Sequence, residues 1–166
     1  MPKPNAHHRQ KLSTLELLTA LEAQHFSEIS SETLLALGGA SVANLLVSPQ
    51  SQYWIRAWAA RAFYYHWSDL ALEPLLKSLH DPHWRVRMNA ARTLGLHAGI
   101  SALEGLLEAL RDPYWRVREA AAMGLGRIAD LEAVDALQAA FWDEHEAVQT
   151  AIEWALSKLE RVTKQR

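Results

Sequence analysis

The sequence contains no cysteine among its 166 residues. This absence excludes disulfide bonds and metal sites built on thiolates, and it fits a reducing compartment. No apolar run approaches the roughly 20 residues that a membrane-spanning helix needs. Residues 1–11 lack the apolar core of a signal peptide and read as a disordered leader. We therefore expect a cytoplasmic protein that does not associate with membranes.

A strong excess of either charge is also missing, because the formal net charge is only −2. This balance argues against a protein that coats nucleic acid through bulk positive charge. The length is that of one domain with enough material for a core. The apolar fraction of 49% argues against a wholly disordered chain, and the seven tryptophans are the one unusual count.

What the sequence does contain is an internal repeat. Residues 112–126 repeat residues 81–95 at an offset of 31, and 10 of the 15 aligned positions are identical. Weaker matches at the same offset extend the pattern back to about Ser41 and forward through Asp143 and Val148. A fixed period of this length is typical of stacked repeat arrays.

Each repeat is predicted to be a hairpin of two helices joined at an Asp-Pro turn, because leucines recur at helical spacing before the turn. The expected first helices cover residues 70–80, 101–111 and 132–142. The expected second helices cover residues 83–97, 114–128 and 144–160, with ends between Gly95 and Gly99 and near Gly126.

The two ends of the chain depart from the period. Residues 12–26 and 32–37 predict two further helices, and we interpret residues 12–39 as an N-terminal helical cap. About four hairpins then occupy residues 40–160, and residues 161–166 form a charged tail. The whole chain is expected to be one domain.

The pattern Leu-x-x-Leu…Asp-Pro-x-Trp-x-Val-Arg-x-x-Ala-Ala-x-x-Leu-Gly resembles the HEAT-like repeats first associated with phycobilisome lyases. Engineered helical-repeat binders use a similar consensus. The resemblance covers about residues 41–159. It implies an all-α fold, a right-handed α-solenoid of HEAT-like hairpins with helical caps. It also implies that the second helices line a concave face.

By this implication the concave face is rich in Trp and Arg, the residue types that dominate binding energy at protein interfaces. We expect a partner-binding groove formed by Tyr53, Trp54, Trp58, Arg61, Trp84, Arg85, Asn89, Arg92, Trp115, Arg116, Glu119 and Trp154. Trp84 and Trp115 share one repeat position, so the alternative that they pack on the neighbouring hairpin stays open.

The resemblance also implies a structural ladder of Asp and Arg between repeats. The corresponding residues here are Arg56, Asp81, Arg87, Asp112, Arg118 and Asp143. Charges that are partly buried need partners, which favours a structural role. Gln149 replaces the Arg in the last repeat, so the ladder is expected to end there.

The resembled family includes an iron-dependent hydroxylase, whose His-Glu pairs directly follow the Val-Arg. Those positions here hold Ala57-Trp58, Met88-Asn89, Glu119-Ala120 and Thr150-Ala151, which argues against that activity. His80, Asp81 and His83 could grip a metal only with a further ligand, and none is visible in the sequence. We expect no catalytic residue, metal or cofactor.

We infer a non-catalytic scaffold that binds another protein through the groove. One alternative is a bilin lyase or chaperone-like subunit of the phycobilisome-lyase family, with Trp and Arg holding the rings and propionates of a tetrapyrrole. A second alternative is single-stranded nucleic-acid binding through aromatic stacking and Arg. The net charge and the nearby Glu119, Asp143 and Glu146 argue against that alternative.

Overall fold

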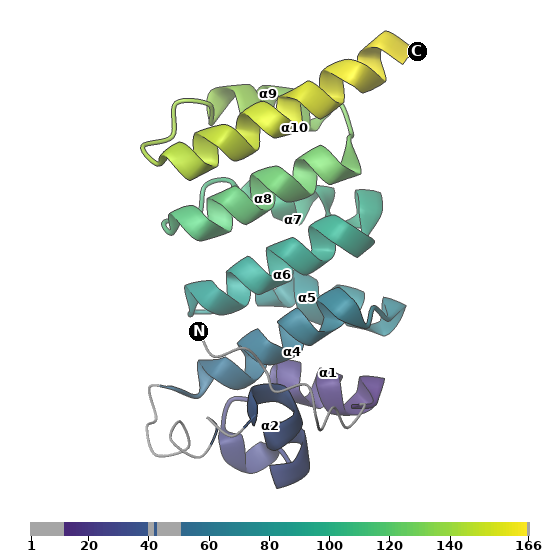
Figure 1. Ribbon diagram of the computed structural model, residues 1–166, viewed down its shortest axis with the longest axis vertical. Coiled ribbons are helices and arrows are strands. Elements are labelled where there is room, and N and C mark those ends of the chain that lie inside the picture. The colour runs from purple at the N-terminus through teal and green to yellow at the C-terminus, as the bar shows by residue number, and fades with distance from the viewer. Residues whose placement is uncertain (1–11, 40–41, 43–50, 166) are drawn as a thin grey trace.

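The computed structural model describes residues 12–39, 42 and 51–165, and every regular element within these ranges is helical. The helices stack in two layers along the long axis of the molecule (Figure 1). The predicted leader over residues 1–11 lies outside the described residues, and so does most of the segment 40–50 that would begin the first hairpin.

The layer nearer the viewer in Figure 1 consists of the second helices of the hairpins: α4 (Tyr53–Tyr65), α6 (Trp84–His97), α8 (Trp115–Ile128) and α10 (Glu146–Gln165). The layer behind consists of the shorter first helices: α5 (Leu72–Ser78), α7 (Leu103–Ala109) and α9 (Ala133–Ala139). The 3₁₀ turns η4 (Asp69–Ala71) and η5 (Gly99–Ala102) precede α5 and α7. The all-α solenoid of hairpins that the sequence predicts is confirmed.

One apolar stripe on each second helix faces the space between the layers. Val86, Ala90 and Leu94 of α6 are fully buried, and their equivalents 31 residues later on α8 are fully buried too. Residues spaced by three or four positions share a helix face, which is why the stripe is continuous. Because the alanines are small, neighbouring helices approach closely and the hairpins share one continuous core.

The N-terminal cap consists of α1 (Thr14–Glu22), η1 (Phe26–Glu28) and α2 (Ser31–Gly38). The side chain of Ser13 accepts a hydrogen bond from the backbone N–H of Glu16, and the carboxylate of Glu16 accepts one from the backbone N–H of Ser13 at 2.8 Å. This reciprocal capping lowers the pKa of Glu16, because the donated bonds favour the ionised carboxylate. Leu17 and Leu21 are buried and join α1 to the core.

The predicted helix ends are confirmed, because α6 ends at His97, between Gly95 and Gly99, and α8 ends at Ile128, near Gly126; Gly95 and Gly126 themselves lie within the last turn of their helices. A Cβ atom on Gly95 would lie 2.3 Å from the Cα of Gly124 on the next second helix. These glycines therefore bring neighbouring helices together. The residue that follows α8, Ala129, adopts a left-handed conformation with φ of 56°. The segment predicted as a tail over residues 161–166 continues α10 as far as Gln165.

One ion pair of the same kind joins each hairpin to the next, at three successive junctions. The distance from Arg Nε to Asp Oδ2 is 2.6 Å in each of the pairs Arg56–Asp81, Arg87–Asp112 and Arg118–Asp143. We call these six residues the Arg–Asp ladder. In every pair the Arg lies on a second helix, and the Asp lies in the turn before the following second helix.

The middle pair shows how the ladder satisfies its buried charges. Arg87 donates two hydrogen bonds to the carboxylate of Asp112, at 2.6 and 2.9 Å, and its third nitrogen donates to the carbonyl of Asp81 at 2.8 Å. The same carboxylate accepts the backbone N–H of Tyr114 at 2.8 Å. The Arg87 and Asp112 side chains are only 14% and 7% exposed, so these bonds hold the charges with little help from water.

The ladder stops at the last hairpin because Gln149 stands where an Arg would be. The amide nitrogen of Gln149 donates to the carbonyl of Asp143 at 2.7 Å, which reproduces the bond that Arg118 makes to the carbonyl of Asp112. Gln149 thus makes the hydrogen bond to the turn of its own hairpin, as Arg87 and Arg118 do. Its amide has no guanidinium group with which to bind a carboxylate through two parallel hydrogen bonds.

The substitution Asp143→Asn tests the ladder through pH. The bonds donated by Arg118 hold the pKa of Asp143 below its usual value. The ionised carboxylate therefore stabilises the fold above about pH 4, and this contribution is lost as pH falls through the lowered pKa. We expect D143N to lower the free energy of unfolding by about 2–4 kcal/mol at pH 7.

Denaturant unfolding at pH 7 and in steps below pH 4 measures this effect. The difference between D143N and wild type should narrow in acid, because the wild-type carboxylate is then protonated as well. Asp135→Asn, on the exposed side of α9, is the matched control and should change little. A difference that stays constant down to pH 2 would show that the charge of Asp143 does not stabilise the fold.

The substitution Gly95→Ala tests the close contact between α6 and α8. The added methyl group would meet backbone atoms of Gly124, which cannot move without separating the helices. We expect a loss of about 1–3 kcal/mol, although Ala favours a helix over Gly by up to about 1 kcal/mol. Gly105→Ala in α7 is the control, because its methyl group would meet mainly the flexible end of Leu79. Thermal unfolding measures both variants. Equal losses of stability in G95A and G105A would contradict this account.

Candidate functional site

The twelve residues predicted to bind a partner all lie on α4, α6, α8 and α10. None of them is fully buried: Arg61 and Arg92 are exposed, and the other ten are partly exposed. We call the outward side of these four helices the second-helix face. The structure therefore brings the predicted residues onto one layer of the solenoid (Figure 1).

Aromatic rings stack between consecutive hairpins along this face. The ring centroids are 3.3 Å apart for Tyr53 and His83, 4.0 Å for Trp84 and Tyr114, and 3.7 Å for Trp115 and His145. In each pair the second ring belongs to the residue just before the following second helix. Trp84 and Trp115 thus each pack with one side of the ring on the neighbouring hairpin, as the packing alternative predicted. Both side chains are nevertheless partly exposed.

His83, Tyr114 and His145 were not predicted as part of the site. They occupy the variable position between the Asp-Pro turn and the Trp, or its equivalent in the last hairpin. The signal that could have revealed them is a ring-bearing residue at the same position in three successive repeats. Their rings cap the stacks and fix where the next helix begins.

Two arginines lie between the stacked rings. The guanidinium carbon of Arg85 is 4.3 Å from the Trp84 ring centroid and 5.1 Å from that of Trp54. That of Arg116 is 4.2 Å from Trp115 and 5.6 Å from Trp84. Indole rings attract cations through the negative face of the ring. Together Trp54, Arg85, Trp84, Arg116 and Trp115 form what we call the ring–guanidinium ladder.

Each of these guanidinium groups also donates a hydrogen bond to a tyrosine hydroxyl. Arg85 donates to the hydroxyl of Tyr53 at 3.4 Å, and Arg116 donates to that of Tyr114 at 3.3 Å. Within the described part of the chain, no Asp or Glu forms an ion pair with either arginine. The ladder therefore presents two ordered positive charges that an anionic group could still reach.

Burial and the nearby positive charges lower the pKa of His83, with burial the larger cause and Arg85 next. The Nδ1 atom of His83 also accepts the backbone N–H of Arg85 at 3.2 Å, which requires that nitrogen to be unprotonated. His83 is therefore neutral at pH 7. It caps α6 without adding a charge beside Arg85.

The remaining predicted residues have more varied surroundings. Arg92 lies 3.9 Å from Glu119 on the next helix, and the Asn89 amide donates to the carbonyl of Arg85 at 2.9 Å. The Trp58 ring stacks on Trp54 with centroids 5.6 Å apart and packs closely over Gly38 of α2, so it also anchors the cap. Asn89 and Trp58 are thus partly engaged within the protein itself.

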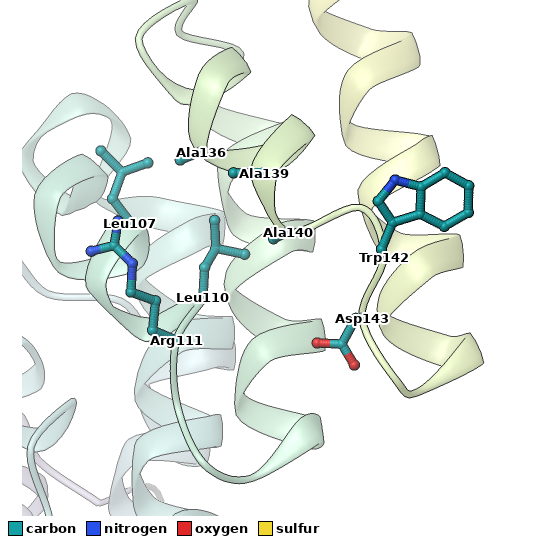
Figure 2. Close-up of a pocket in the computed structure, with 8 residues that line it drawn as sticks. All are labelled: Leu107, Leu110, Arg111, Ala136, Ala139, Ala140, Trp142 and Asp143. Carbon is teal, nitrogen blue, oxygen red and sulfur yellow. The ribbon is translucent and has the colours of Figure 1, made fainter.

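A second surface feature lies on the opposite layer. A cleft of about 280 Å³ between α7 and α9 is lined by Leu107, Leu110, Arg111, Ala136, Ala139, Ala140, Trp142 and Asp143. Figure 2 shows the Trp142 indole pointing away from the two leucines, and this side chain is 85% exposed. The Asp143 carboxylate is already bound to Arg118. The cleft is therefore a small, mostly apolar depression whose one acid has a partner.

Two further findings concern the described residues. Across residues 12–39, 42 and 51–165, no group of three or more His, Cys, Asp or Glu side chains is arranged so that it could hold a metal ion. None of the helices described there has both the length and the apolar character needed to span a bilayer. The bilin alternative and the phycobilisome-lyase subtype stay predictions.

Comparison with known proteins agrees with the geometry of the hairpins. The family model for a single HEAT repeat matches residues 71–96, and the family model for HEAT repeats matches residues 103–164, together just over half of the chain. No curated protein matches the sequence. The matched segments correspond to the hairpin that ends with α6 and to the stretch from α7 to α10.

Among solved structures, the fold is similar to that of human deoxyhypusine hydroxylase in complex with glycerol. The TM-score is 0.60 at 24% sequence identity, and the match covers 97% of this chain and 47% of the hydroxylase chain. This chain thus spans about half the length of that protein, and a likeness at this identity shows the fold alone. Because the HEAT family models match its repeats and its hairpins stack as such repeats do, the chain belongs to the HEAT-repeat proteins.

Proposed function

We propose that this chain is a non-catalytic scaffold that binds another protein through the second-helix face. The observation that carries the proposal is the ring–guanidinium ladder. Its rings and guanidinium groups contact one another and are partly exposed. Among the described residues, neither Arg85 nor Arg116 forms an ion pair with an Asp or Glu. Trp and Arg in such positions are the side chains that most often dominate a protein interface.

Order in the free protein supports this proposal on energetic grounds. Long side chains such as Arg lose roughly 0.5–1.5 kcal/mol of conformational freedom each when an interface immobilises them. Arg85 and Arg116 are already held between rings and tyrosine hydroxyls. A partner that meets them therefore loses less binding energy to the ordering of this surface.

The arrangement of the rings favours a protein partner over single-stranded nucleic acid. Sequence-tolerant binding of single strands relies on bases that stack on open aromatic faces. Here the rings of Tyr53, Trp84 and Trp115 already stack on rings of the next hairpin, and guanidinium groups lie over Trp84 and Trp115. What the surface offers is ring edges and guanidinium N–H groups, which suit the polar and acidic groups of a protein.

The double variant Arg85→Ala/Arg116→Ala tests the proposal. It removes both guanidinium groups of the ladder and leaves the Arg–Asp ladder intact. Each exposed cation–π contact is worth about 0.5–1 kcal/mol, and the variant removes the four contacts of the ladder, so we expect the melting temperature to fall by less than about 16 °C. Capture of partners from an extract of the source organism should fall at least about tenfold when quantified by mass spectrometry, because hot-spot residues cost about 2 kcal/mol or more each.

The matched control is Glu104→Ala/Glu108→Ala, which alters two exposed residues of α7 in the opposite layer. This control should capture the same partners as wild type. Equal capture by R85A/R116A and wild type would show that the second-helix face does not bind the partner. A folded state lost in R85A/R116A would show that the ladder is part of the core instead.

A further inference from the structure

A cleft on the second-helix layer includes only Trp154 of the twelve residues predicted for the groove. It has a volume of about 550 Å³ and lies where the C-terminal ends of α6, α8 and α10 meet. Eight of its eleven lining residues are glycine, aliphatic or tryptophan, and the other three are Arg127, Lys158 and Arg161. The cleft thus combines an apolar interior with positive charge.

Glycines shape the floor of this cleft. Gly126 of α8 is buried, and a Cβ atom there would lie 2.6 Å from the Trp154 ring and 2.7 Å from the Cα of Ala155. The absence of a side chain therefore lets the Trp154 ring pack directly against α8. Gly95 also lines the cleft, at the point where α6 packs closely on Gly124 of α8.

The charge of the cleft is of one sign. The guanidinium carbon of Arg127 and the Nζ atom of Lys158 lie 6.0 and 5.4 Å from the Trp154 ring centroid. None of the described residues that line the cleft is Asp or Glu. Within the same described residues, Arg127, Lys158 and Arg161 form no ion pair. Three neighbouring cations without a counterion raise the local potential and attract an anionic group.

The charges elsewhere on the described surface are mixed. The short first helices carry several exposed acids, namely Glu73, Glu104, Glu108 and Asp135. On the second-helix face, Glu119 is engaged by Arg92. Both layers nevertheless carry charges of both signs, because Lys77 and Arg111 are exposed on the first-helix layer and α10 carries the exposed acids Glu146, Glu153 and Glu160. The unpaired cations of the cleft are therefore a local feature of the surface.

We propose that this cleft binds an acidic peptide segment of the partner, with a carboxylate held by Arg127, Lys158 and Arg161 and a neighbouring apolar side chain held against Trp154. This proposal rests on the proposed function and specifies the chemistry of its partner. Charge complementarity selects the acid, and the apolar lining selects a side chain beside it. The three cations of the cleft surround one apolar pocket beside Trp154, an arrangement that suits a single carboxylate next to an apolar side chain.

Selection from a displayed library of random twelve-residue peptides tests the proposal. Wild-type protein should enrich peptides with Asp or Glu next to Leu, Ile, Phe or Trp. The enriched peptides are then synthesised with a fluorescent label, and their affinity is measured by anisotropy at about 0.15 M salt. The variant Arg127→Gln/Lys158→Gln should bind them at least about tenfold more weakly, because charge-assisted hydrogen bonds are lost.

The matched control is Lys77→Gln/Arg111→Gln, which removes two exposed cations from the first-helix layer and changes the net charge equally. It should bind the enriched peptides as wild type does. Enrichment of neutral or basic peptides, or of none, would overturn the proposal. Equal affinity of R127Q/K158Q would also overturn it, and so would tighter binding of a labelled oligo(dT) strand than of the enriched peptides.

The two proposals can fail separately. If R85A/R116A loses the native partner and R127Q/K158Q keeps it at wild-type affinity, the scaffold function stands and the acidic-peptide cleft is wrong. If capture of the native partner is unchanged in both variants, the second-helix face is not its binding surface and both proposals fall.

Discussion

The bidentate contact between an Arg on one hairpin and an Asp in the turn of the next is the interaction on which the rest of this structure depends. A helical hairpin of this size cannot bury its apolar stripe alone, so its stability comes from its neighbours. Apolar contacts between alanine-rich helices favour close packing but do not by themselves fix how far one hairpin slides along the next. The Arg87–Asp112 pair does so, because two parallel hydrogen bonds at 2.6 and 2.9 Å tolerate little displacement.

The same register controls the outer surface. Arg85 and Arg87 are two residues apart at the start of α6, so they point in different directions. The Arg87 side chain donates to Asp112 in the turn of the following hairpin. The Arg85 guanidinium group lies instead over the rings of Tyr53, Trp54 and Trp84. A stack such as Trp84 on Tyr114, with centroids 4.0 Å apart, needs the hairpins at a fixed spacing. The buried Arg–Asp ladder therefore fixes the positions of the residues in the ring–guanidinium ladder, which forms the proposed binding surface.

Much of the fold was predictable from the sequence, because the period of 31 residues appears in the residues that form the core. The leucine spacing and the Asp-Pro turns place the hairpins within a few residues of their observed ends. The glycines could not be interpreted the same way. α6 and α8 end close to Gly95 and Gly126 as predicted, but the sequence did not show that the missing side chains of these glycines let neighbouring helices pack closely. The Arg–Asp partners followed from the family resemblance and not from spacing alone.

The sequence placed the twelve candidate residues on one layer of helices, but it did not show their contacts or include His83, Tyr114 and His145. A sequence shows that Trp84 and Arg85 lie near the start of a helix, but the ring that covers Trp84 comes from Tyr114 in another hairpin. The cleft beside Trp154 was missed although some of its residues share repeat positions: Gly126 corresponds to Gly95, and Lys158 lies 31 residues after Arg127. The sequence does not show that these positions from neighbouring helices meet around one cavity.

A double-mutant cycle on Arg87 and Asp112 measures the central interaction most directly. Arg87→Gln, Asp112→Asn and the combined variant are unfolded in denaturant at pH 7, and the coupling free energy is the departure from additivity. This account predicts a coupling of at least about 1.5 kcal/mol, together with weakened partner capture in each single variant because the outer ladder loses its register. A coupling near zero, with both single variants as stable as wild type, would contradict it.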